Sequence, residues 1–409
     1  MYLSSIEERM IKGEFGAAKA LALKVIVKVG EALGAQELVE VGHAHISGVS
    51  YFNVGDAGLE FIEDLVLSGG SVEVFTSANP YMVMSDYLGV RHGDGVVDKQ
   101  LRIIKALDKL GVKFYTCAPY NVRPPRLGEH LAWAESNAVL YSNTVLGALS
   151  NKEGGPLALL AAITGRTHKS GVHLLSNRKP KVLVNVVGVG EVELGFLGLM
   201  IGELIGERIP YILGLSFRST YSLKSFLAGL GTTSNTPMAI VDGVTPGYKE
   251  LVSDAAYEEF FKISGEDVKS YIKKFSSDVA GGRGLYLIGC PHLSYNELVS
   301  VLKMLIDEVS SMSGLPDLSD RELWITTYEG FVDRGVKEML NKLMRYNIKV
   351  IGSSCAVVSR LDLLKVNYVV TDSSKACSYI SRLCKVPVVV LPTKKLIKTF
   401  LTGGLSLSL

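Results

Sequence analysis

The chain has 409 residues, of which 43 are basic and 41 acidic, giving a formal net charge of +2. This length exceeds what one hydrophobic core usually organises, so we expect two or three domains. The balanced charge argues against a nucleic-acid or other polyanionic partner and favours small-molecule substrates.

The N-terminal sequence MYLSSIEERMIKGEFG carries acidic residues early and lacks the apolar core of a secretory signal. The most apolar region, residues 192–217, is interrupted by Glu203, Glu207 and Arg208 and by several glycines, so we expect no membrane-spanning segment. The five cysteines are odd in number and do not form the disulfide framework of a secreted protein. We therefore expect a soluble cytoplasmic protein.

Residues 1–40 are expected to be mainly helical, because AAKALALKVIVKVGEAL places apolar residues at helical spacing. In the glycine-rich region that follows, short apolar runs predict strands at 72–75, 112–115, 181–187, 209–215 and 238–241. In the last third, strands are expected at 285–288, 323–327, 349–351, 368–371 and 386–391. Val/Ile/Leu-rich strands that alternate with helices indicate an α/β fold with mainly parallel sheets, covered by helices on both faces.

A charged segment at 264–278, followed by AGGRG, marks the expected start of the last unit. We predict an N-terminal helical segment with a substrate loop at 1–70, an α/β domain at 71–278 and a C-terminal α/β domain at 279–409. The loop is GHAHISGVSYFNVGDAG at 42–58, whose glycines and hydroxyls suit backbone binding of an anion, although an ordinary turn-rich connection would look similar. His43 and His45 within it suit either a metal pair or two capped surface imidazoles.

Two further polar clusters are candidates for function. One contains Glu135, Ser136 and Asn137, which a solvated face would explain equally well. The other is TDSSK at 371–375, where hydroxyls and Lys375 follow a predicted strand. A serine helix cap explains this second cluster, but the lysine would also suit a carboxylate or a phosphate.

Three of the cysteines follow predicted strands: Cys117, Cys290 and Cys355. The second of them, in GCPHLS, is expected in a strand-to-helix turn, because a capping-box pattern, Ser-x-x-Glu at 294–297, begins the next helix. Burial would explain each thiol singly, but three at equivalent strand ends would suit a soft metal. Cys377 and Cys384 lie seven residues apart on one helical face, and for them burial in a core is the better interpretation.

The spacing of the three strand-end cysteines matches no local zinc or ferredoxin motif, so any shared site would be assembled across domains. Three thiolates on a [4Fe–4S] cluster would leave one iron open as a Lewis acid. A fully ligated cluster would instead indicate electron transfer.

With these residues in view, the chain resembles the large subunit of the aconitase X family. The resemblance covers residues 42–376 and rests on these motifs: GHAHISGVSYFNVGDAG, TSANP, TCAPY, AESNAVLYSNTVLGA, NKEGGP, AAITGRT, GCPHLS, SSC and TDSSKA. It implies an aconitase-like multi-domain fold and a hydro-lyase with a [4Fe–4S] cluster held by Cys117, Cys290 and Cys355. It also implies substrate contacts from Gly48, Val49, Ser50, Asn79, Pro80, Glu135, Ser136, Ser374 and Lys375.

The family also needs a small swivelling domain, and none is expected in this chain. The resemblance therefore implies a heterodimer with a separate small subunit, which would carry the catalytic base, a serine. The separate subunit and the presence of only two glutamines, as in thermophilic proteins, favour a phosphorylated hydroxy acid. The first hypothesis is dehydration of mevalonate 5-phosphate to trans-anhydromevalonate 5-phosphate in archaeal isoprenoid biosynthesis. The alternatives are dehydration of cis-3-hydroxyproline or another β-hydroxy acid, and a non-catalytic iron–sulfur sensor.

Overall fold

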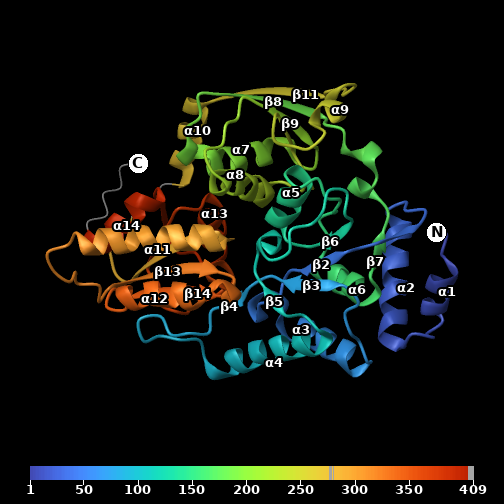
Figure 1. The fold of residues 1–409 in the computed structure, drawn as a ribbon, viewed down its shortest axis with the longest axis horizontal. Helices are drawn as coiled ribbons and strands as arrows, with labels where there is room; N and C mark the ends of the chain where they lie inside the picture. Colours follow the sequence, from blue (N-terminus) through green and yellow to red (C-terminus); the bar gives the residue numbers. More distant parts are fainter. Residues whose placement is uncertain (276–278, 280, 404–409) are drawn as a thin grey trace.

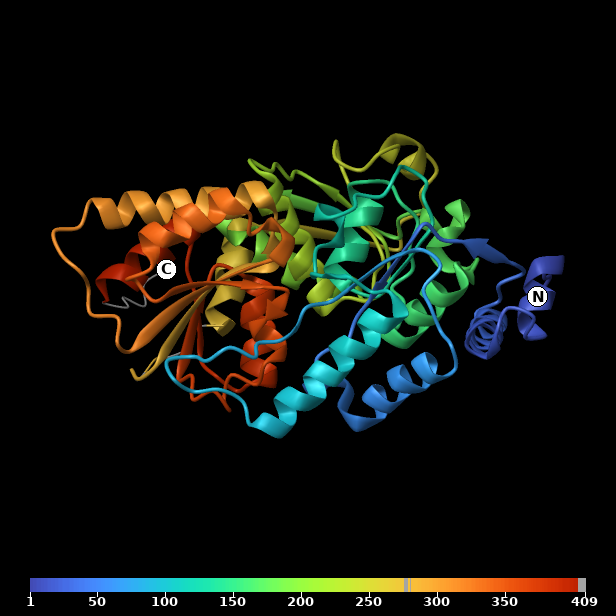
Figure 2. The same cartoon turned by 60° about the horizontal axis from the view of Figure 1, so that its bottom comes forward.

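We describe the chain from a computed structural model that covers residues 1–275, 279 and 281–403. Most strands belong to three parallel sheets with helices packed on them. Figure 1 shows the N-terminal unit at the right, the middle unit at the top and the C-terminal unit at the left, and Figure 2 shows the same separation from another side. The predicted α/β class with mainly parallel, helix-covered sheets is confirmed.

The first sheet has the strand order β5-β3-β2-β6, with parallel pairing throughout. Its strands are β2 (His43–Ile46), β3 (Phe75–Ala78), β5 (Phe114–Tyr115) and β6 (Leu131–Trp133). The helices of this unit are α1 (Ser5–Ile11), α2 (Ala17–Ala32), α3 (Tyr51–Leu67), α4 (Asp94–Leu110), α5 (Ser136–Thr144) and α6 (Gly155–Thr164). A separate antiparallel pair joins β1 (Leu38–Glu40) to β7 (Arg166–His168).

The centre of this sheet differs from the sequence prediction. Residues 43–46, interpreted as part of a loop, form the buried strand β2, and β6 was not predicted. The strand expected at 72–75 lies later, at Phe75–Ala78. All three strands are short and carry His, Ser, Thr or Trp among few aliphatic residues, so their composition resembles a polar connection although they are mostly buried.

The second sheet has the order β10-β9-β8-β11 and is also parallel. It contains β8 (Val182–Val187), β9 (Pro210–Leu213), β10 (Ile240–Val241) and β11 (Glu259–Ser264), with α7 (Leu194–Ile205), α8 (Thr220–Thr233), α9 (Tyr248–Val252) and α10 (Gly265–Ile272). Helices α7 and α8 cross closely at Gly198, where a Cβ atom would lie 2.2 Å from the carbonyl oxygen of Phe226. Helix α8 also packs against α5 of the first unit and against α13 and β12 of the third. It therefore lies between the three units.

Ser219 begins α8 as its N-cap, and its Oγ accepts the backbone N–H of Ser222 at 3.1 Å. Replacing Ser219 with alanine is expected to lower the free energy of unfolding by about 1 kcal/mol, because one backbone donor of the first turn loses its partner. Urea denaturation would measure the change. Ser310→Ala is the control, because Ser310 is exposed and lies near the end of another helix. It should shift the free energy of unfolding by less than about 0.5 kcal/mol. Equal losses of stability in both variants would contradict the role of Ser219 as an N-cap.

The third sheet has the order β14-β13-β12-β16-β17, again parallel. Its strands are β12 (Gly284–Leu293), β13 (Arg321–Thr327), β14 (Ile348–Gly352), β16 (Tyr368–Thr371) and β17 (Val388–Val390), and its helices are α11 (Tyr295–Ser310), α12 (Arg334–Leu343), α13 (Ser374–Leu383) and α14 (Thr393–Thr402). Tyr286 and Ile288 face one apolar core and Leu285 and Leu287 face the other. Burial of both faces explains why these strands are almost continuously apolar and were predicted.

One detail at Cys290 is corrected. It was expected in a turn after a strand ending at residue 288, but β12 runs on to Leu293 past an irregularity in its pairing with β13. Cys290 therefore lies in the irregular last part of the strand. The expected helix cap at Ser294, with Glu297 as its partner, is confirmed.

Shorter elements complete the chain. Strands β4 (Tyr81–Met82) and β15 (Ser354–Cys355) pair in parallel and connect the first unit to the third. The short 3-10 helices are η1 (Pro119–Asn121), η2 (Gly171–His173), η3 (Leu175–Arg178), η4 (Glu191–Glu193), η5 (Lys273–Phe275), η6 (Glu329–Phe331) and η7 (Ala356–Val358).

The division into 1–70, 71–278 and 279–409 stays a prediction; residue 278 and the segment 404–409 lie outside the described residues. Over residues 1–275, 279 and 281–403, every helix is too short or too polar to cross a membrane.

Candidate active site

A cavity of about 280 Å³ lies where the first and third sheets meet. It is lined by Ser47, Asn53, Asn79, Pro80, Cys117, Ala134, Glu135, Ser136, Cys290, Cys355, Val357, Val358, Lys375, Tyr379 and Leu383. Every strand of the first sheet contributes a residue from just beyond its carboxyl end, where ligands collect in open parallel sheets. The third unit supplies Cys290 near the end of β12, residues of β15 and η7, and one face of α13 from Lys375 to Leu383.

The cavity brings together the three cysteines from the strand ends. Cys117 is buried, and Cys290 and Cys355 are partly exposed. Burial raises the pKa of all three thiols, that of Cys117 to about 12, and the nearby Cys290 and Cys117 raise the pKa of Cys355 further. Backbone N–H groups point at two of the sulfurs: His292 donates to Cys117 Sγ at 3.2 Å, and Val357 and Val358 donate to Cys355. The sulfurs are thus close to one another and supplied with donors that favour thiolates.

The thiols do not form a site for a single ion. Over the described residues, no group of three or more His, Cys, Asp or Glu side chains is arranged to hold one metal ion. An ion with metal–sulfur bonds of about 2.3 Å would need its sulfurs within about 4 Å of one another. A cubane cluster distributes three cysteines over three irons and therefore needs wider spacing. Three cysteines from separate segments of the chain line one cavity, and thiolates are the side chains that hold iron–sulfur clusters, so this set of donors fits such a group.

Beside the thiols lies a buried ion pair between Glu135 and Lys375. Lys375 Nζ donates to Glu135 Oε1 at 2.5 Å, and both residues are less than a tenth exposed. Asn137 Nδ2 donates to the same oxygen at 2.7 Å, and Asn79 Nδ2 donates to Oε2 at 2.7 Å. Burial alone would raise the pKa of Glu135, but Lys375 and the two amides outweigh it and lower this pKa to about 2. The carboxylate therefore stays ionised at neutral pH.

This shift predicts how the stability of the chain depends on pH. Because the pKa of Glu135 falls from 4.5 to about 2 on folding, its contribution is present above pH 4.5 and is lost as the pH falls towards 2. The loss amounts to about 3 kcal/mol. Urea denaturation at pH 5 and pH 3 should show a shallower pH dependence for Glu135→Gln than for the wild type. Parallel pH profiles would contradict the shift; Glu14→Gln, at an exposed position, is the control.

Behind Asn79, two histidines of β2 support the hydrogen bonds around Glu135. His43 Nε2 and His45 Nδ1 each lie 2.8 Å from Ser77 Oγ, and His45 Nε2 lies 2.9 Å from Asn79 Oδ1. Both imidazoles are fully buried, so the interpretation as surface residues was wrong. Burial lowers the pKa of His45 to about 4 and that of His43 well below its usual range. Neutral rings linked through Ser77 therefore orient Asn79 towards Glu135.

The predicted substrate loop lies beside the cavity, although its three predicted residues do not line it. Gly48, Val49 and Ser50 precede α3, while Ser47 and Asn53 on either side are the lining residues. Ser50 Oγ donates to the carbonyl of Val358 at 2.8 Å and so ties the loop to the segment after Cys355. Val49 is buried, and its carbonyl accepts from Gln100 at 3.0 Å.

The other predicted residues divide between the cavity and its surroundings. Asn79, Pro80, Glu135, Ser136 and Lys375 line it, whereas Ser374 does not. The Ser374 hydroxyl is buried against α7, 2.6 Å from where a Cβ atom on Gly195 would lie.

The lining residues that sequence reasoning missed include Tyr379 and Leu383, at helical spacing after Lys375 on α13. Their i+4 and i+8 spacing from Lys375 could have placed all three on one helix face. Cys377 and Cys384 are buried in the apolar core beside this helix, which confirms the expectation for them.

Family models match the chain along almost its whole length, with the aconitase X first domain at residues 1–176, the second at 180–273 and the third at 284–402. The chain belongs to the aconitase X family. It is similar to the crystal structure of the holo-form of Thermococcus kodakaraensis aconitase X, with a TM-score of 0.87 and 34% identity over 97% of this chain and 99% of the other.

Curated relatives are of two kinds. The phosphomevalonate dehydratase large subunit of Thermococcus kodakarensis is 35% identical over 93% of this chain and 95% of the relative. The protein of the same name from Methanocaldococcus jannaschii is 33% identical over 97% of this chain and all of the relative. The cis-3-hydroxy-L-proline dehydratase of Pseudomonas aeruginosa is 34% identical over 73% of this chain, but the match covers only 53% of that protein.

Proposed function

We propose that the chain is the large subunit of a hydro-lyase that dehydrates mevalonate 5-phosphate to trans-anhydromevalonate 5-phosphate in isoprenoid biosynthesis. Five of the relatives are named phosphomevalonate dehydratase large subunit and match at least 93% of this chain. The observation that carries the proposal is the convergence of Cys117, Cys290 and Cys355 on one cavity beside the Glu135–Lys375 pair. In this proposal the enzyme is a cytoplasmic heterodimer with a small swivel-domain subunit.

The three thiols would hold a [4Fe–4S] cluster, which supplies a Lewis-acidic iron at the cavity. A bound metal keeps its cysteine ligands deprotonated, which overcomes the raised pKa of these buried thiols. The N–H groups of His292, Val357 and Val358 then donate to sulfurs that carry negative charge.

The reaction removes a proton from C2 of the substrate and the hydroxyl from C3, which leave together as water, and a carbon–carbon double bond forms between the two atoms. Glu135 is a poor candidate for the base, because a carboxylate with a pKa of about 2 accepts a proton weakly near neutral pH. We assign the proton abstraction to a serine of the small subunit. Glu135 instead orients Lys375 and Asn79.

We propose that Lys375 and Asn79 bind the substrate carboxylate, since one Lys375 N–H is used by Glu135 and others are left for a ligand. The segment of Gly48, Val49 and Ser50, together with Pro80, Ser136 and Ser374, remains the proposed frame of the substrate site. In this proposal, backbone amides of this segment receive an anionic end of the substrate. The Tyr51 N–H is not among them, because it already donates to Gln100 Oε1 at 2.9 Å.

The second candidate substrate is cis-3-hydroxy-L-proline, after the names of the relatives that match this chain over only about half of their own length. Co-expression with a small-subunit partner, followed by anaerobic purification and assay with each substrate, distinguishes the two. We expect the absorbance of a conjugated enoate to appear with mevalonate 5-phosphate only. Turnover of cis-3-hydroxy-L-proline alone would overturn the first assignment, and turnover of neither would favour the non-catalytic iron–sulfur sensor.

A further inference from the structure

Helix α8 buries a charged side chain behind the cysteine cavity. Lys224 is 2% exposed, although lysine is among the residues least often fully buried. Its Nζ donates to Glu297 Oε2 at 2.7 Å and to the carbonyl oxygen of His292 at 3.2 Å. The lysine belongs to the second unit and both acceptors belong to the third, so this contact crosses the boundary between two units.

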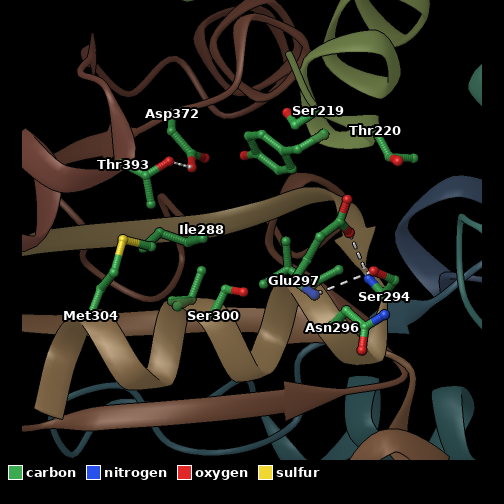
Figure 3. Close-up of a pocket in the computed structure, with 13 residues that line it drawn as sticks. Ser219, Thr220, Ile288, Ser294, Asn296, Glu297, Ser300, Met304, Asp372 and Thr393 are labelled. Carbon is green, nitrogen blue, oxygen red and sulfur yellow. Dashed lines mark hydrogen bonds between the residues drawn. The ribbon is translucent and has the colours of Figure 1, made fainter. Parts of the chain in front are cut away.

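Glu297 in turn holds the end of β12. Its Oε2 accepts the backbone N–H of Ser294 at 2.8 Å, and its own backbone N–H points back to Ser294 Oγ at 3.4 Å, as the dashed lines in Figure 3 show. The two residues form the capping box that begins α11. They also line a cavity of about 440 Å³, distinct from the cysteine cavity, whose wall includes Asp372 and Tyr221.

His292 connects the segments that carry the three cysteines. It is 1% exposed and lies two residues after Cys290. Its backbone N–H donates to Cys117 Sγ at 3.2 Å, and its ring Nε2 lies 3.1 Å from the carbonyl oxygen of Ser354, next to Cys355. One residue thus contacts all three cysteine segments through its backbone and its ring, and Lys224 binds the remaining backbone acceptor, its carbonyl.

Stability alone does not explain a lysine at this place. A buried ion pair contributes little over well-packed apolar side chains of the same volume, because both charges must leave water. An apolar residue at 224 could not, however, donate to the His292 carbonyl. The distinctive contribution of Lys224 is therefore a fixed direction for the backbone between Cys290 and Ser294.

We propose that Lys224 is a positioning residue for the three thiols: it fixes His292, and His292 holds Cys117, Cys290 and Cys355 in the arrangement that a cluster requires. Insofar as the thiols hold a cluster, this inference rests on the proposed function. Residues that hold the ligands of a metal in position have effects of this kind. Replacing such a residue lowers metal affinity about 10-fold to 100-fold.

The test uses the double variant Lys224→Met/Glu297→Gln. Methionine keeps the apolar length of the lysine, and glutamine keeps the capping box without leaving an unpaired buried charge. The matched control is Arg166→Met/Glu7→Gln, because Glu7 also pairs with a cation from a distant element, at 2.9 Å, and also serves the capping box of its helix. Neither control residue lines the cysteine cavity.

Two measurements are made on the wild type, the double variant and the control, and the melting temperature of each is determined as well. The first is the rate of iron release to a chelator after anaerobic reconstitution, together with the electron paramagnetic resonance spectrum. The second is the rate of Cys117 alkylation by iodoacetamide in the metal-free protein, which does not depend on a cluster. We expect the double variant to release iron about 10-fold faster or more, with an altered spectrum. In the metal-free protein, Cys117 of the double variant should be alkylated faster than Cys117 of the wild type.

These changes should occur while the double variant and the control melt within a few degrees of the wild type. Wild-type rates and spectrum in the double variant would overturn the inference. A fall in melting temperature larger than that of the control, with unchanged Cys117 alkylation below the transition, would also overturn it, because Lys224 would then act on folding alone. If the wild type takes up no iron, the proposed function fails, and the alkylation rates still decide the role of Lys224.

Discussion

Replacement of Lys375 with methionine is expected to lower the free energy of unfolding by about 3–5 kcal/mol and to abolish dehydration. The substitution leaves the Glu135 carboxylate buried without the cation that keeps it ionised. It also removes the one lysine among the residues that line the cavity in the described part of the chain. Urea denaturation of the metal-free protein measures the first effect, and assay of the reconstituted enzyme measures the second.

The double variant Lys375→Met/Glu135→Gln separates the two effects. Without the unpaired carboxylate, most of the lost stability should return, whereas activity should not, because the donor for the substrate is still missing. Lys99→Met serves as the control, since its partner Asp56 is largely exposed and such pairs contribute little. A Lys375→Met protein as stable as the Lys99→Met protein would contradict the account of the pair.

The second large effect concerns the cysteines. Serine at position 117, 290 or 355 is expected to prevent stable assembly of the cluster, because the hydroxyl is a far weaker ligand than a thiolate for iron. Each variant should bind substantially less iron after anaerobic reconstitution and show no turnover. Iron analysis and the broad charge-transfer absorption of the cluster measure the outcome.

Serine at Cys377 and at Cys384 provides the matched controls. Both thiols are buried in the apolar core beside α13 and line no part of the cysteine cavity. These variants should keep the wild-type iron content and absorption, with only a modest loss of stability from burying a hydroxyl. An intact cluster in Cys290→Ser, or its loss in Cys384→Ser, would show that the ligands are wrongly assigned.

The third sheet could be predicted from the sequence because its strands are buried on both faces and are therefore apolar almost without interruption. The first sheet could not be predicted as well. Its central strand β2 is four residues long, contains His43 and His45 and is followed by a Ser-Gly pair, which together have the composition of a loop. These histidines are hydrogen-bonded to Ser77 on β3 and to Asn79 just after it, so a local pattern does not reveal that they are buried.

The candidate site shows the same contrast between local and distant information. Positions at or after strand ends singled out Cys117, Cys290 and Cys355. Because Cys117 follows a strand of the first sheet and the other two belong to the third unit, their meeting depends on how the two units pack. The pairing of Glu135 with Lys375 joins residues 240 positions apart and depends on how the first and third units pack, which periodicity does not encode. The role of Lys224 could not be predicted for the same reason. It is a single polar residue on an otherwise apolar helix face, and its partners lie in another unit.

The central claim is that three thiols of this chain hold a cluster with one iron left for the substrate. Mössbauer spectroscopy of the ⁵⁷Fe-reconstituted complex with the small subunit tests it most directly. We expect one iron in four to differ from the other three, and only its signal to change when mevalonate 5-phosphate is added. Four irons that respond alike, or a spectrum that the substrate leaves unchanged, would contradict the claim.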